Sequence, residues 1–554
     1  MKSYISLLTF CFLSIVSYGQ IKESQTIDSI FIEWDQADVP GCALGVIKNG
    51  ELVYSKGYGI GDLEHDIKIT PSSVFYIGSV SKQFVTFSIL LLEEQGKLDL
   101  DDEIQKYLPD FPEYNSPLTI RHFIHHTSGV RDYLTLMYLK GRNYLDNTDE
   151  DEVYELIKRQ EELNFTPGEK YLYSNSCYFM LAMIIEKAAG QSLKEFAHKN
   201  IFQPLGMRNT LFYDDNTDLI RNRVFSYRKR EKEGYDNLIM RFDLVGSGGV
   251  YSSIEDLFLW DQNFYDNKLG KGGQDIIEKM HIEGLLNNGE SSGYAFALHK
   301  DIYKGLKTVS HGGSLAGYRA QLMRFPEEQL SIIILANRGD ANPTAKSFQI
   351  ADILLYDKFI DPSLKENNSE TQIATNQEPE FTLNQLVGNY EIQVGAQLEI
   401  SIKNDSLNVL QSWNKSTYKI VNTTGNTYEI TNDPSIQFVF SELKKDETQI
   451  LTVFQEGNET TCKRKESTDL SKLDTEDYTG QFYSKELDAT YLLFKEGETL
   501  KIKIANYEAQ ELVIYGKDIF TTDGDLVRFH RSNGKIEGFE LDAGRVTNLK
   551  FEKK

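Results

Sequence analysis

The sequence predicts a domain in which helices pack on a sheet, followed by two small all-β antiparallel barrels. Residues 41–46 and 51–57 alternate around Asn49-Gly50, and Asn-Gly between apolar runs is typical of a β-hairpin. Residues 75–96 have the apolar spacing of a largely buried helix. Beyond residue 380 the chain changes to short alternating strands, which repeat once with a period of 92 residues.

The helix expected over residues 75–96 begins with a Ser-x-x-Lys pattern. Ser79 lies at its beginning, and Gly96 is expected to end it. Positions i and i+3 share one face of a helix, so Lys82 should pass beside the Ser79 hydroxyl while Ser81 points elsewhere. The apolar residues that define the buried face recur at spacings of three and four: Val80, Phe84, Phe87, Leu90 and Leu91.

These residue types suit nucleophilic catalysis. A serine hydroxyl is a poor nucleophile until a neighbour takes its proton, and lysine can do so only in its neutral form. Burial and the positive end of a helix both disfavour the ammonium, and first-turn amides can stabilise an oxyanion. Alone, so short a pattern is better explained by Ser79 as a helix N-cap and Lys82 as a solvated helix residue, and the other motifs of the chain change this balance.

A second motif lies on a loop that enters a helix. Residues 165–180 read FTPGEKYLYSNSCYFM, with a turn at Pro167-Gly168 and an apolar helix expected over 177–189. Tyr173 and Asn175 therefore lie where side chains can converge on a site. A tyrosine hydroxyl can relay protons and an asparagine amide can hold a carbonyl, although a tyrosine in this aromatic-rich chain can also be a core residue.

A third motif, His311-Gly312-Gly313, is placed at the end of a strand, before a hairpin expected over residues 322–325 and 330–335. Glycines at a strand edge allow another backbone, here a substrate, to approach closely. The alternative is that His311 is a surface histidine with satisfied hydrogen bonds.

Residues 121–132, RHFIHHTSGVRD, contain three histidines. His122 and His125 at i, i+3 invite a zinc interpretation, but no carboxylate or third ligand follows at a usual spacing. We expect these histidines to pack or to hydrogen-bond a turn at residues 127–129. No metal site and no cofactor are predicted.

Charge and the N-terminal segment indicate the setting of the protein. The 554 residues have a formal net charge of -24, which disfavours nucleic acid and an anionic membrane surface as partners. Residues 1–19 have one lysine, an apolar core and a small-x-small end, as in a signal peptide. We expect a periplasmic or extracellular protein cleaved near Gly19, without a stable membrane anchor because the apolar core is short.

Taken together, Ser79-x-x-Lys82, Tyr173-x-Asn175 and His311-x-Gly313 resemble the serine β-lactamase and penicillin-binding-protein superfamily. The pattern is closest to its class C β-lactamase, D-aminopeptidase and esterase branch. The resemblance covers about residues 27–359 and implies an α+β fold, an antiparallel sheet flanked by helices. Further stretches are similar to that family: residues 96–102, 126–129, 166–168, 204–207 and 248–250.

The resemblance implies an acyl-enzyme mechanism. Ser79 would be the nucleophile, and Lys82 and Tyr173 would shuttle its proton. The backbone amides of Ser79 and Ser314 would form the oxyanion hole, in which removing one donor typically costs about 3 kcal/mol.

The same resemblance assigns substrate binding to Asn175, His311 and Gly313. Many members have Lys-Thr-Gly where this chain has His311-Gly312-Gly313, and that lysine helps bind the carboxylate of a β-lactam or a terminal D-alanine. Histidine is at most partly charged near pH 7, so efficient β-lactam hydrolysis is disfavoured. His-x-Gly resembles the D-aminopeptidase and esterase members instead.

We therefore predict an exported serine hydrolase that acts on an ester or amide of a small molecule or short peptide containing a D-amino acid. One alternative is a D-Ala-D-Ala-type carboxypeptidase or weak β-lactamase. An alternative of another class is a catalytically silent sensor or wall-binding protein. The intact Ser79, Lys82 and Tyr173 favour an enzyme.

The C-terminal third follows a polar segment that reads as a linker. Residues 386–390 resemble 478–482, which indicates two barrels. In the D-aminopeptidases a barrel loop reaches the active-site mouth, but barrels can also be spacers or modules for homo-oligomerisation. The predicted order is a signal peptide (1–19), a serine hydrolase domain (20–360), a linker (361–380) and two barrels (381–467 and 468–554).

Overall fold

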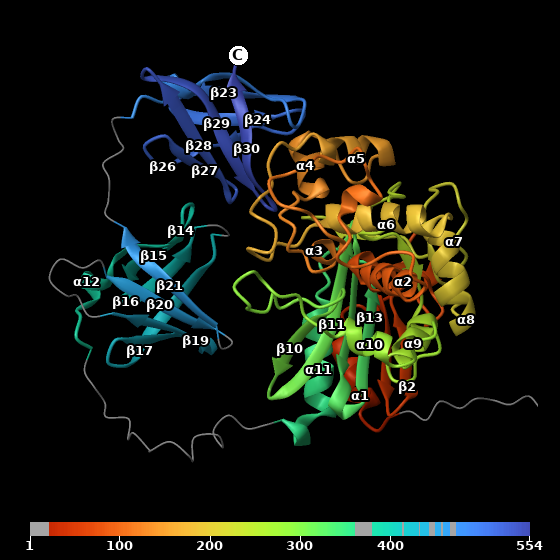
Figure 1. The fold of residues 1–554 in the computed structure, drawn as a ribbon. Helices are drawn as coiled ribbons and strands as arrows, with labels where there is room; N and C mark the ends of the chain where they lie inside the picture. The colour runs from red at the N-terminus through yellow and green to blue at the C-terminus, as the bar shows by residue number, and fades with distance from the viewer. Residues whose placement is uncertain are drawn as a thin grey trace, which may run out of the picture. The chain divides into compact units, whose positions relative to one another are not determined.

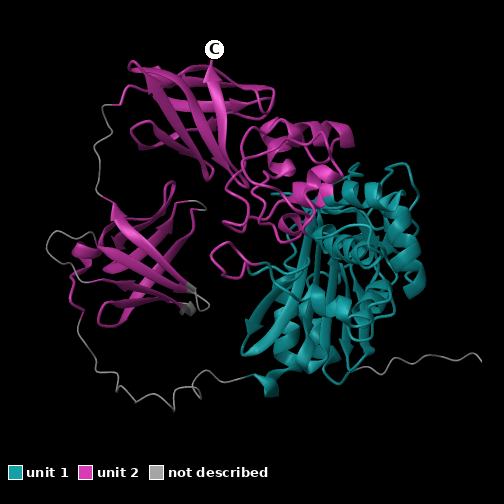
Figure 2. Ribbon diagram, viewed as in Figure 1, with its two compact units in different colours: residues 1–100, 181–284, 293–361 teal, residues 101–180, 285–292, 362–554 magenta. Residues whose placement is uncertain are grey.

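The computed structural model describes residues 21–359, 379–412, 415–431, 433–441, 449–455, 458–465 and 473–554. The expected signal peptide and nearly all of the expected linker lie outside the described residues. The chain divides into two compact units, drawn in two colours in Figure 2: residues 1–100, 181–284 and 293–361, and residues 101–180, 285–292 and 362–554. No helix within the described ranges is long and apolar enough to cross a membrane.

The first unit is built on a six-stranded antiparallel sheet with the order β10-β11-β12-β13-β1-β2 (Figure 1). The most buried strand of this sheet, β13, pairs with β12 and β1, so a segment that is apolar except for Ser331 occupies the middle of the sheet. The strands are β1 (Cys42–Lys48), β2 (Glu51–Tyr58), β10 (His299–Tyr303), β11 (Leu306–Leu315), β12 (Tyr318–Phe325) and β13 (Leu330–Ala336).

Both predicted hairpins are confirmed. Asn49 and Gly50 have φ angles of 52° and 81°, as a two-residue turn that matches the strand twist requires. The turn between β12 and β13 contains the 3₁₀ segment η4 (Pro326–Glu328), followed by Gln329 with φ 47°. The motif at 311–313 is not at a strand end, however, because β11 continues to Leu315.

Helices cover both faces of this sheet. Side chains of α1 (Ser24–Ile30) and α11 (Pro343–Leu354) share one apolar core with Leu44 and Val46 of β1. Gly45 points to the other face, where α9 (Ile254–Asn263) packs so closely that a Cβ on Gly45 would lie 2.5 Å from Ile254 Cγ2. The intervening glycine therefore lets the helix approach the sheet.

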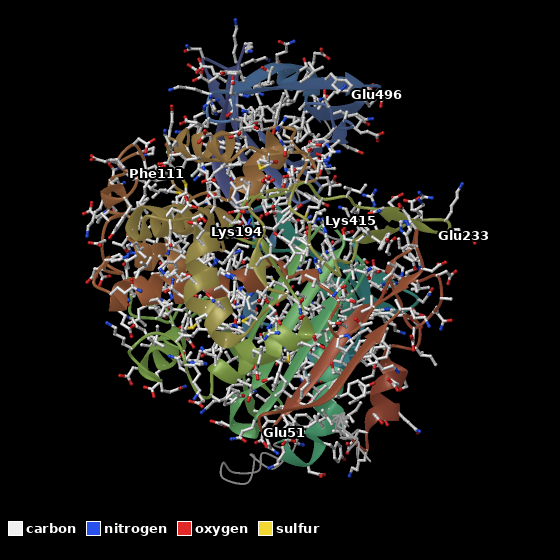
Figure 3. All side chains as sticks on the ribbon, turned by 90° about the vertical axis from the view of Figure 1, so that its right-hand side faces the viewer. Glu51, Phe111, Lys194, Glu233, Lys415 and Glu496 are labelled. Atoms are coloured by element: carbon white, nitrogen blue, oxygen red, sulfur yellow. The ribbon has the colours of Figure 1, made fainter. Side chains whose placement is uncertain are left out.

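The remaining elements of this unit are short. Charged side chains such as Glu51 at the beginning of β2 and Lys194 on α7 are accessible to solvent (Figure 3). The elements are β3 (Ile60–Asp62), β4 (Ile67–Lys68), β6 (Leu211–Phe212), β7 (Tyr227–Lys229), β8 (Tyr235–Asn237), α7 (Leu193–Ala197), η3 (His198–Phe202), α8 (Gln203–Leu205), α10 (Asp275–Met280) and η5 (Tyr356–Lys358).

The segment predicted as one helix over 75–96 is three elements. It begins with β5 (Phe75–Tyr76), which pairs with β9 (Val250–Ser252). A 3₁₀ turn, η1 (Gly78–Ser81), leads into α2 (Lys82–Glu94), and Gly96 with φ 67° ends it as predicted. The apolar period is therefore confirmed for α2, while strand pairing overrides it at the first two residues.

The second unit contains a helical part and the two barrels. Its helices are η2 (Ile104–Lys106), α3 (Ile120–Ile124), α4 (Tyr133–Leu139), α5 (Glu150–Lys158) and the beginning of α6 (Asn175–Ala189). After α12 (Leu383–Leu386), eight antiparallel strands close into the first barrel. They are β14 (Gly388–Gln393), β15 (Ala396–Lys403), β16 (Ser406–Gln411), β17 (Thr417–Thr424), β18 (Thr427–Ile430), β19 (Asp433–Phe440), β20 (Ile450–Gln455) and β21 (Asn458–Lys465).

The second barrel follows η7 (Thr475–Tyr478) and is a nearly closed nine-stranded antiparallel sheet with β25 and β26 at its two ends. The predicted fold class is confirmed: an α+β domain followed by two antiparallel barrels. The strands are β22 (Gly480–Ser484), β23 (Ala489–Glu496), β24 (Thr499–Ile504), β25 (Gln510–Glu511), β26 (Val513–Gly516), β27 (Ile519–Thr522), β28 (Asp525–Ser532), β29 (Lys535–Ala543) and β30 (Val546–Lys553).

Candidate active site

Ser79 lies in the 3₁₀ turn η1 of the first unit. Every residue from Ser73 to Leu92 is buried except Ser79, which is partly accessible. Ser79 is therefore the one residue of this long buried segment that solvent reaches. Ser81 is buried, and its hydroxyl accepts a hydrogen bond from the Val250 amide at 3.1 Å, so the two serines have different surroundings.

Lys82 is buried beside Ser79. Its Nζ lies 3.2 Å from Ser79 Oγ and also donates to the Ser247 carbonyl at 2.5 Å. The second contact fixes the end of a flexible side chain, so the amine stays within hydrogen-bond reach of the serine hydroxyl. The predicted pairing of residues i and i+3 is present.

The main chain around Ser79 is packed against β11 with almost no space between them. A Cβ on Gly313 would lie 1.9 Å from the Ile77 carbonyl oxygen and 3.1 Å from the Ser79 amide nitrogen. A Cβ on Gly78, which has φ 54°, would lie 2.6 Å from the Ser314 amide nitrogen. The two predicted oxyanion-hole residues, Ser79 and Ser314, thus lie on neighbouring backbones. We call Ser79, Lys82, Ser247, Gly313 and Ser314 the nucleophile group.

His311 is buried on β11 in the same unit. Its Nδ1 donates to the Gly312 carbonyl at 2.6 Å, so in the neutral ring Nε2 accepts from the Tyr294 hydroxyl at 2.9 Å. Burial, with repulsion from His299 and Lys82, holds the pKa of His311 well below its ordinary value of 6.5. The ring is therefore neutral at pH 7 and supplies no positive charge.

Asn175 is the first residue of α6 in the second unit, and Tyr173 lies two residues before it on the preceding loop. Asp132 Oδ2 accepts hydrogen bonds from the Asn175 amide at 2.6 Å and from Asn175 Nδ2 at 2.8 Å. Asp132 Oδ1 accepts from the Thr135 amide at 3.1 Å and so caps α4. Sequence reasoning missed Asp132, although an aspartate just before an apolar run is an N-cap signal.

His126 supports the same loop. Its Nδ1 accepts from the Ser174 amide at 3.1 Å, and its ring lies 4.1 Å from the ring of Tyr173. The carbonyls of His126 and Thr127 also accept from the amides of Leu172 and Gly168. The turn at 127–129 therefore holds the loop that carries Tyr173.

The other histidines of this stretch have structural contacts as well. His122 closes a capping box with Thr119 at the beginning of α3. Among the residues that the structure describes, no three His, Cys, Asp or Glu side chains are grouped as a metal site requires.

Arg545, at the turn between β29 and β30, is a residue that the sequence did not indicate. Its guanidinium lies over the ring of Tyr173, 4.7 Å from the centroid, and its Nη1 is 3.7 Å from Asp132 Oδ2. Nothing local in the sequence connects it to a tyrosine 372 positions earlier. We call Tyr173, Asn175, Asp132, His126 and Arg545 the tyrosine group; it lies in the second unit and the nucleophile group in the first.

Several known proteins are similar to this chain. A family model described as Beta-lactamase matches residues 27–355, more than half of the chain. Penicillin-binding protein 4* of Bacillus subtilis (strain 168) is 29% identical over 381 residues, covering 65% of this chain and 81% of that protein. A D-aminopeptidase of Brucella anthropi is 30% identical over 318 residues, and the match spans 57% of this chain and only 59% of that enzyme.

Two solved structures share the fold at lower identity. The octameric penicillin-binding protein homologue from Pyrococcus abyssi superposes with a TM-score of 0.55 at 21% identity, covering 88% of this chain and 99% of that chain. A D-amino acid amidase from Ochrobactrum anthropi SV3 superposes with a TM-score of 0.52 at 19% identity, covering 60% of this chain and 99% of that chain.

Proposed function

The chain belongs to the beta-lactamase family and is a serine hydrolase of that family, and from this premise we propose that it works through an acyl-enzyme on Ser79. The observation that carries the proposal is the buried Lys82, whose Nζ lies 3.2 Å from the hydroxyl of the one accessible residue between Ser73 and Leu92. A desolvated amine beside a hydroxyl is the arrangement in which lysine acts as a general base.

In the proposed reaction Ser79 Oγ attacks the substrate carbonyl carbon while Lys82 takes the hydroxyl proton. The amides of Ser79 and Ser314 stabilise the oxyanion that forms. The intermediate then breaks the bond to the leaving group, to which Tyr173 and Lys82 return the proton. Water attacks the acyl-enzyme with the same groups acting in reverse, which releases the acid and restores Ser79.

We propose that the substrate is an ester or amide of a small molecule or short peptide containing a D-amino acid. Support comes from the D-aminopeptidase relative and from the neutral His311, where a lysine would offer a carboxylate a positive charge. In this assignment Asn175 orients the substrate, and His311 and Gly313 line the strand along which it binds.

The test is kcat/KM on a matched pair, a short-chain aryl ester and the anilide of D-alanine, with Ser79→Ala as the blank. Turnover of the ester alone identifies an esterase. Cleavage of the anilide that requires a free amino group identifies an aminopeptidase of the D-series. The absence of any Ser79-dependent turnover of either compound contradicts the proposal.

A second candidate is a D-Ala-D-Ala-type carboxypeptidase or weak β-lactamase. It is favoured by Penicillin-binding protein 4*, of whose length the match covers 81%. Release of D-alanine from an acyl-D-alanyl-D-alanine peptide, or opening of a chromogenic cephalosporin, would identify it. A protein whose Ser79 takes up no acylating probe would instead be the silent sensor or wall-binding protein.

We further propose that the protein is exported after cleavage near Gly19 and that it forms homo-oligomers through its barrels. Assembly is suggested by the Pyrococcus abyssi protein, which is described as octameric. N-terminal sequencing of the mature protein tests the cleavage, and light scattering of the full chain tests the assembly. A monomer at micromolar concentration would contradict the second statement.

A further inference from the structure

We propose that Arg545 of the second barrel is a specificity residue, which binds a carboxylate carried by the leaving group of the substrate. This inference rests on the proposed function, in which Tyr173 delivers a proton to that leaving group. It narrows the substrate class to compounds whose leaving group is an amino acid with a free carboxylate.

The guanidinium of Arg545 is held in place, and its hydrogen-bond donors remain available to a ligand. Its central carbon lies over the Tyr173 ring, 4.7 Å from the centroid, and 43% of the side chain remains exposed. Its nearest acid is Asp132, at 3.7 Å, whereas a charge-assisted hydrogen bond measures about 2.7 to 2.9 Å. Asp132 Oδ2 already accepts two hydrogen bonds from Asn175. In the part of the chain that the structure describes, the Arg545 guanidinium has this ion pair and makes no hydrogen bond.

The turn carrying Arg545 is fixed before any substrate arrives. Asn164 Nδ2 donates to the Arg545 carbonyl at 3.0 Å, and the Thr547 amide donates to Asn164 Oδ1 at 2.8 Å. Deeper in the same unit, the buried Arg131 donates to Glu486 Oε1 at 2.7 Å. These contacts join the second barrel to the helical part of its unit, so little ordering remains to be done when a ligand binds.

The chemistry of the guanidinium suits a carboxylate ligand. Its planar group presents parallel N–H donors that match the two oxygens of a carboxylate, and 43% of the side chain is exposed to solvent. When an amino acid is the leaving group, its carboxylate is one carbon away from the nitrogen that Tyr173 protonates. A substrate whose leaving nitrogen is at the Tyr173 hydroxyl would therefore bring this carboxylate close to Arg545, which lies over the tyrosine ring. An ammonium in that position would be repelled by the same residue.

The experiment compares kcat/KM for D-alanyl-D-alanine with that for its carboxamide, each with a free and an N-acetylated amino group. The wild type is expected to prefer the carboxylate form, and Arg545→Met should reduce the ratio by ~10- to 100-fold, because a hydrogen-bonded charge pair is lost. Arg545→Lys keeps the positive charge but loses the planar pair of donors, so its ratio should lie between those of the wild type and Arg545→Met. Lys535→Met removes an exposed positive charge from the same hairpin and should leave the ratio at the wild-type value.

The outcomes separate this inference from the proposed function. Ser79-dependent hydrolysis of an aryl ester, which has no carboxylate in its leaving group, reports the proposed function alone. If the ester is cleaved but the wild type shows no preference for the carboxylate peptides, or cleaves neither peptide, the inference is wrong. The inference is also wrong if Arg545→Met, with an unchanged thermal unfolding midpoint, lowers kcat/KM equally for the carboxylate and carboxamide peptides. Arg545 would then only support the loop that carries Tyr173.

Discussion

The nucleophile group and the tyrosine group are built in different ways. In the nucleophile group, close packing of one backbone segment against another fixes the positions, because Gly78 and Gly313 leave no room for a Cβ. The buried Lys82 is the one long side chain of the group. In the tyrosine group, positions are set by side chains from separate stretches, with Asp132 holding Asn175 and Arg545 lying over Tyr173.

This difference has a consequence for function. A site formed by closely packed backbone segments tolerates almost no change, so it suits the chemical step that every substrate shares. Side chains from loops and from a barrel can be exchanged without rebuilding the core, so those placed around Tyr173, such as Arg545, suit the recognition of a particular leaving group.

Lys82→Ala should lower kcat by ~10²- to 10⁴-fold, because the general base is lost. Lys82→Arg should be no better, since a guanidinium does not give up its proton in proteins. Steady-state kinetics on the aryl ester provides the measurement, with the exposed Lys271→Ala as the matched control. A Lys82→Ala enzyme with near-normal turnover would remove the lysine from the mechanism.

Gly313→Ala should cost ~10²- to 10³-fold in kcat, as the loss of one oxyanion donor does. The added methyl would lie 1.9 Å from the Ile77 carbonyl oxygen, so the backbones that carry Ser79 and Ser314 must separate. Gly516→Ala, where the nearest atom would be 3.7 Å away, is the control and should behave as wild type. Equal activity of the two variants would show that the close approach has no role in catalysis.

Tyr173→Phe should lower kcat by ~10- to 100-fold, less than Lys82→Ala, because the ring and its contacts with His126 and Arg545 stay while only the hydroxyl is lost. The measurement is kcat on an ester with a good leaving group and on the anilide. The anilide should suffer more, since a poor leaving group needs its proton. An equal loss on both substrates would argue against proton delivery by Tyr173.

The smallest effect concerns pH and stability. Because the pKa of His311 is lowered in the folded protein, the unfolded chain binds the proton first, and stability falls as pH drops below about 6.5. His311 contributes at most about 2 kcal/mol between pH 6.5 and pH 5. The thermal unfolding midpoint, measured between pH 6.5 and pH 5, should fall more steeply with decreasing pH for the wild type than for His311→Asn. Parallel curves would mean that His311 is not held neutral by burial.

The sequence predicted what depends on neighbouring residues and missed what depends on distant ones. The pair Ser79 and Lys82 follows from helical spacing alone, and the hairpin at Asn49-Gly50 follows from turn chemistry. The partnership of Asp132 with Asn175 joins residues 43 positions apart, and Arg545 reaches Tyr173 only after a barrel has folded. Tertiary packing determines contacts of this kind, and no periodicity or motif in a single sequence indicates them.

The ends of one helix and one strand also differ from the prediction, because they depend on pairing with residues that are distant in the sequence. Phe75 and Tyr76 fit the apolar spacing of the following helix, yet they pair with β9, whose Tyr251 lies far along the chain. The sequence predicts that His311, Gly312 and Gly313 end a strand, but β11 continues through them, since pairing with β12 places Gly312 and Gly313 opposite Gln321 and Ala320.

The most direct test of the acyl-enzyme is to identify the residue that becomes acylated. The aryl ester would be mixed with the wild type, Ser79→Ala and Ser81→Ala, quenched with acid during turnover and analysed by intact mass and peptide mapping. We expect the acyl group on Ser79 in the wild type and in Ser81→Ala, and no adduct in Ser79→Ala. An adduct on another residue, or unchanged turnover by Ser79→Ala, would contradict the account.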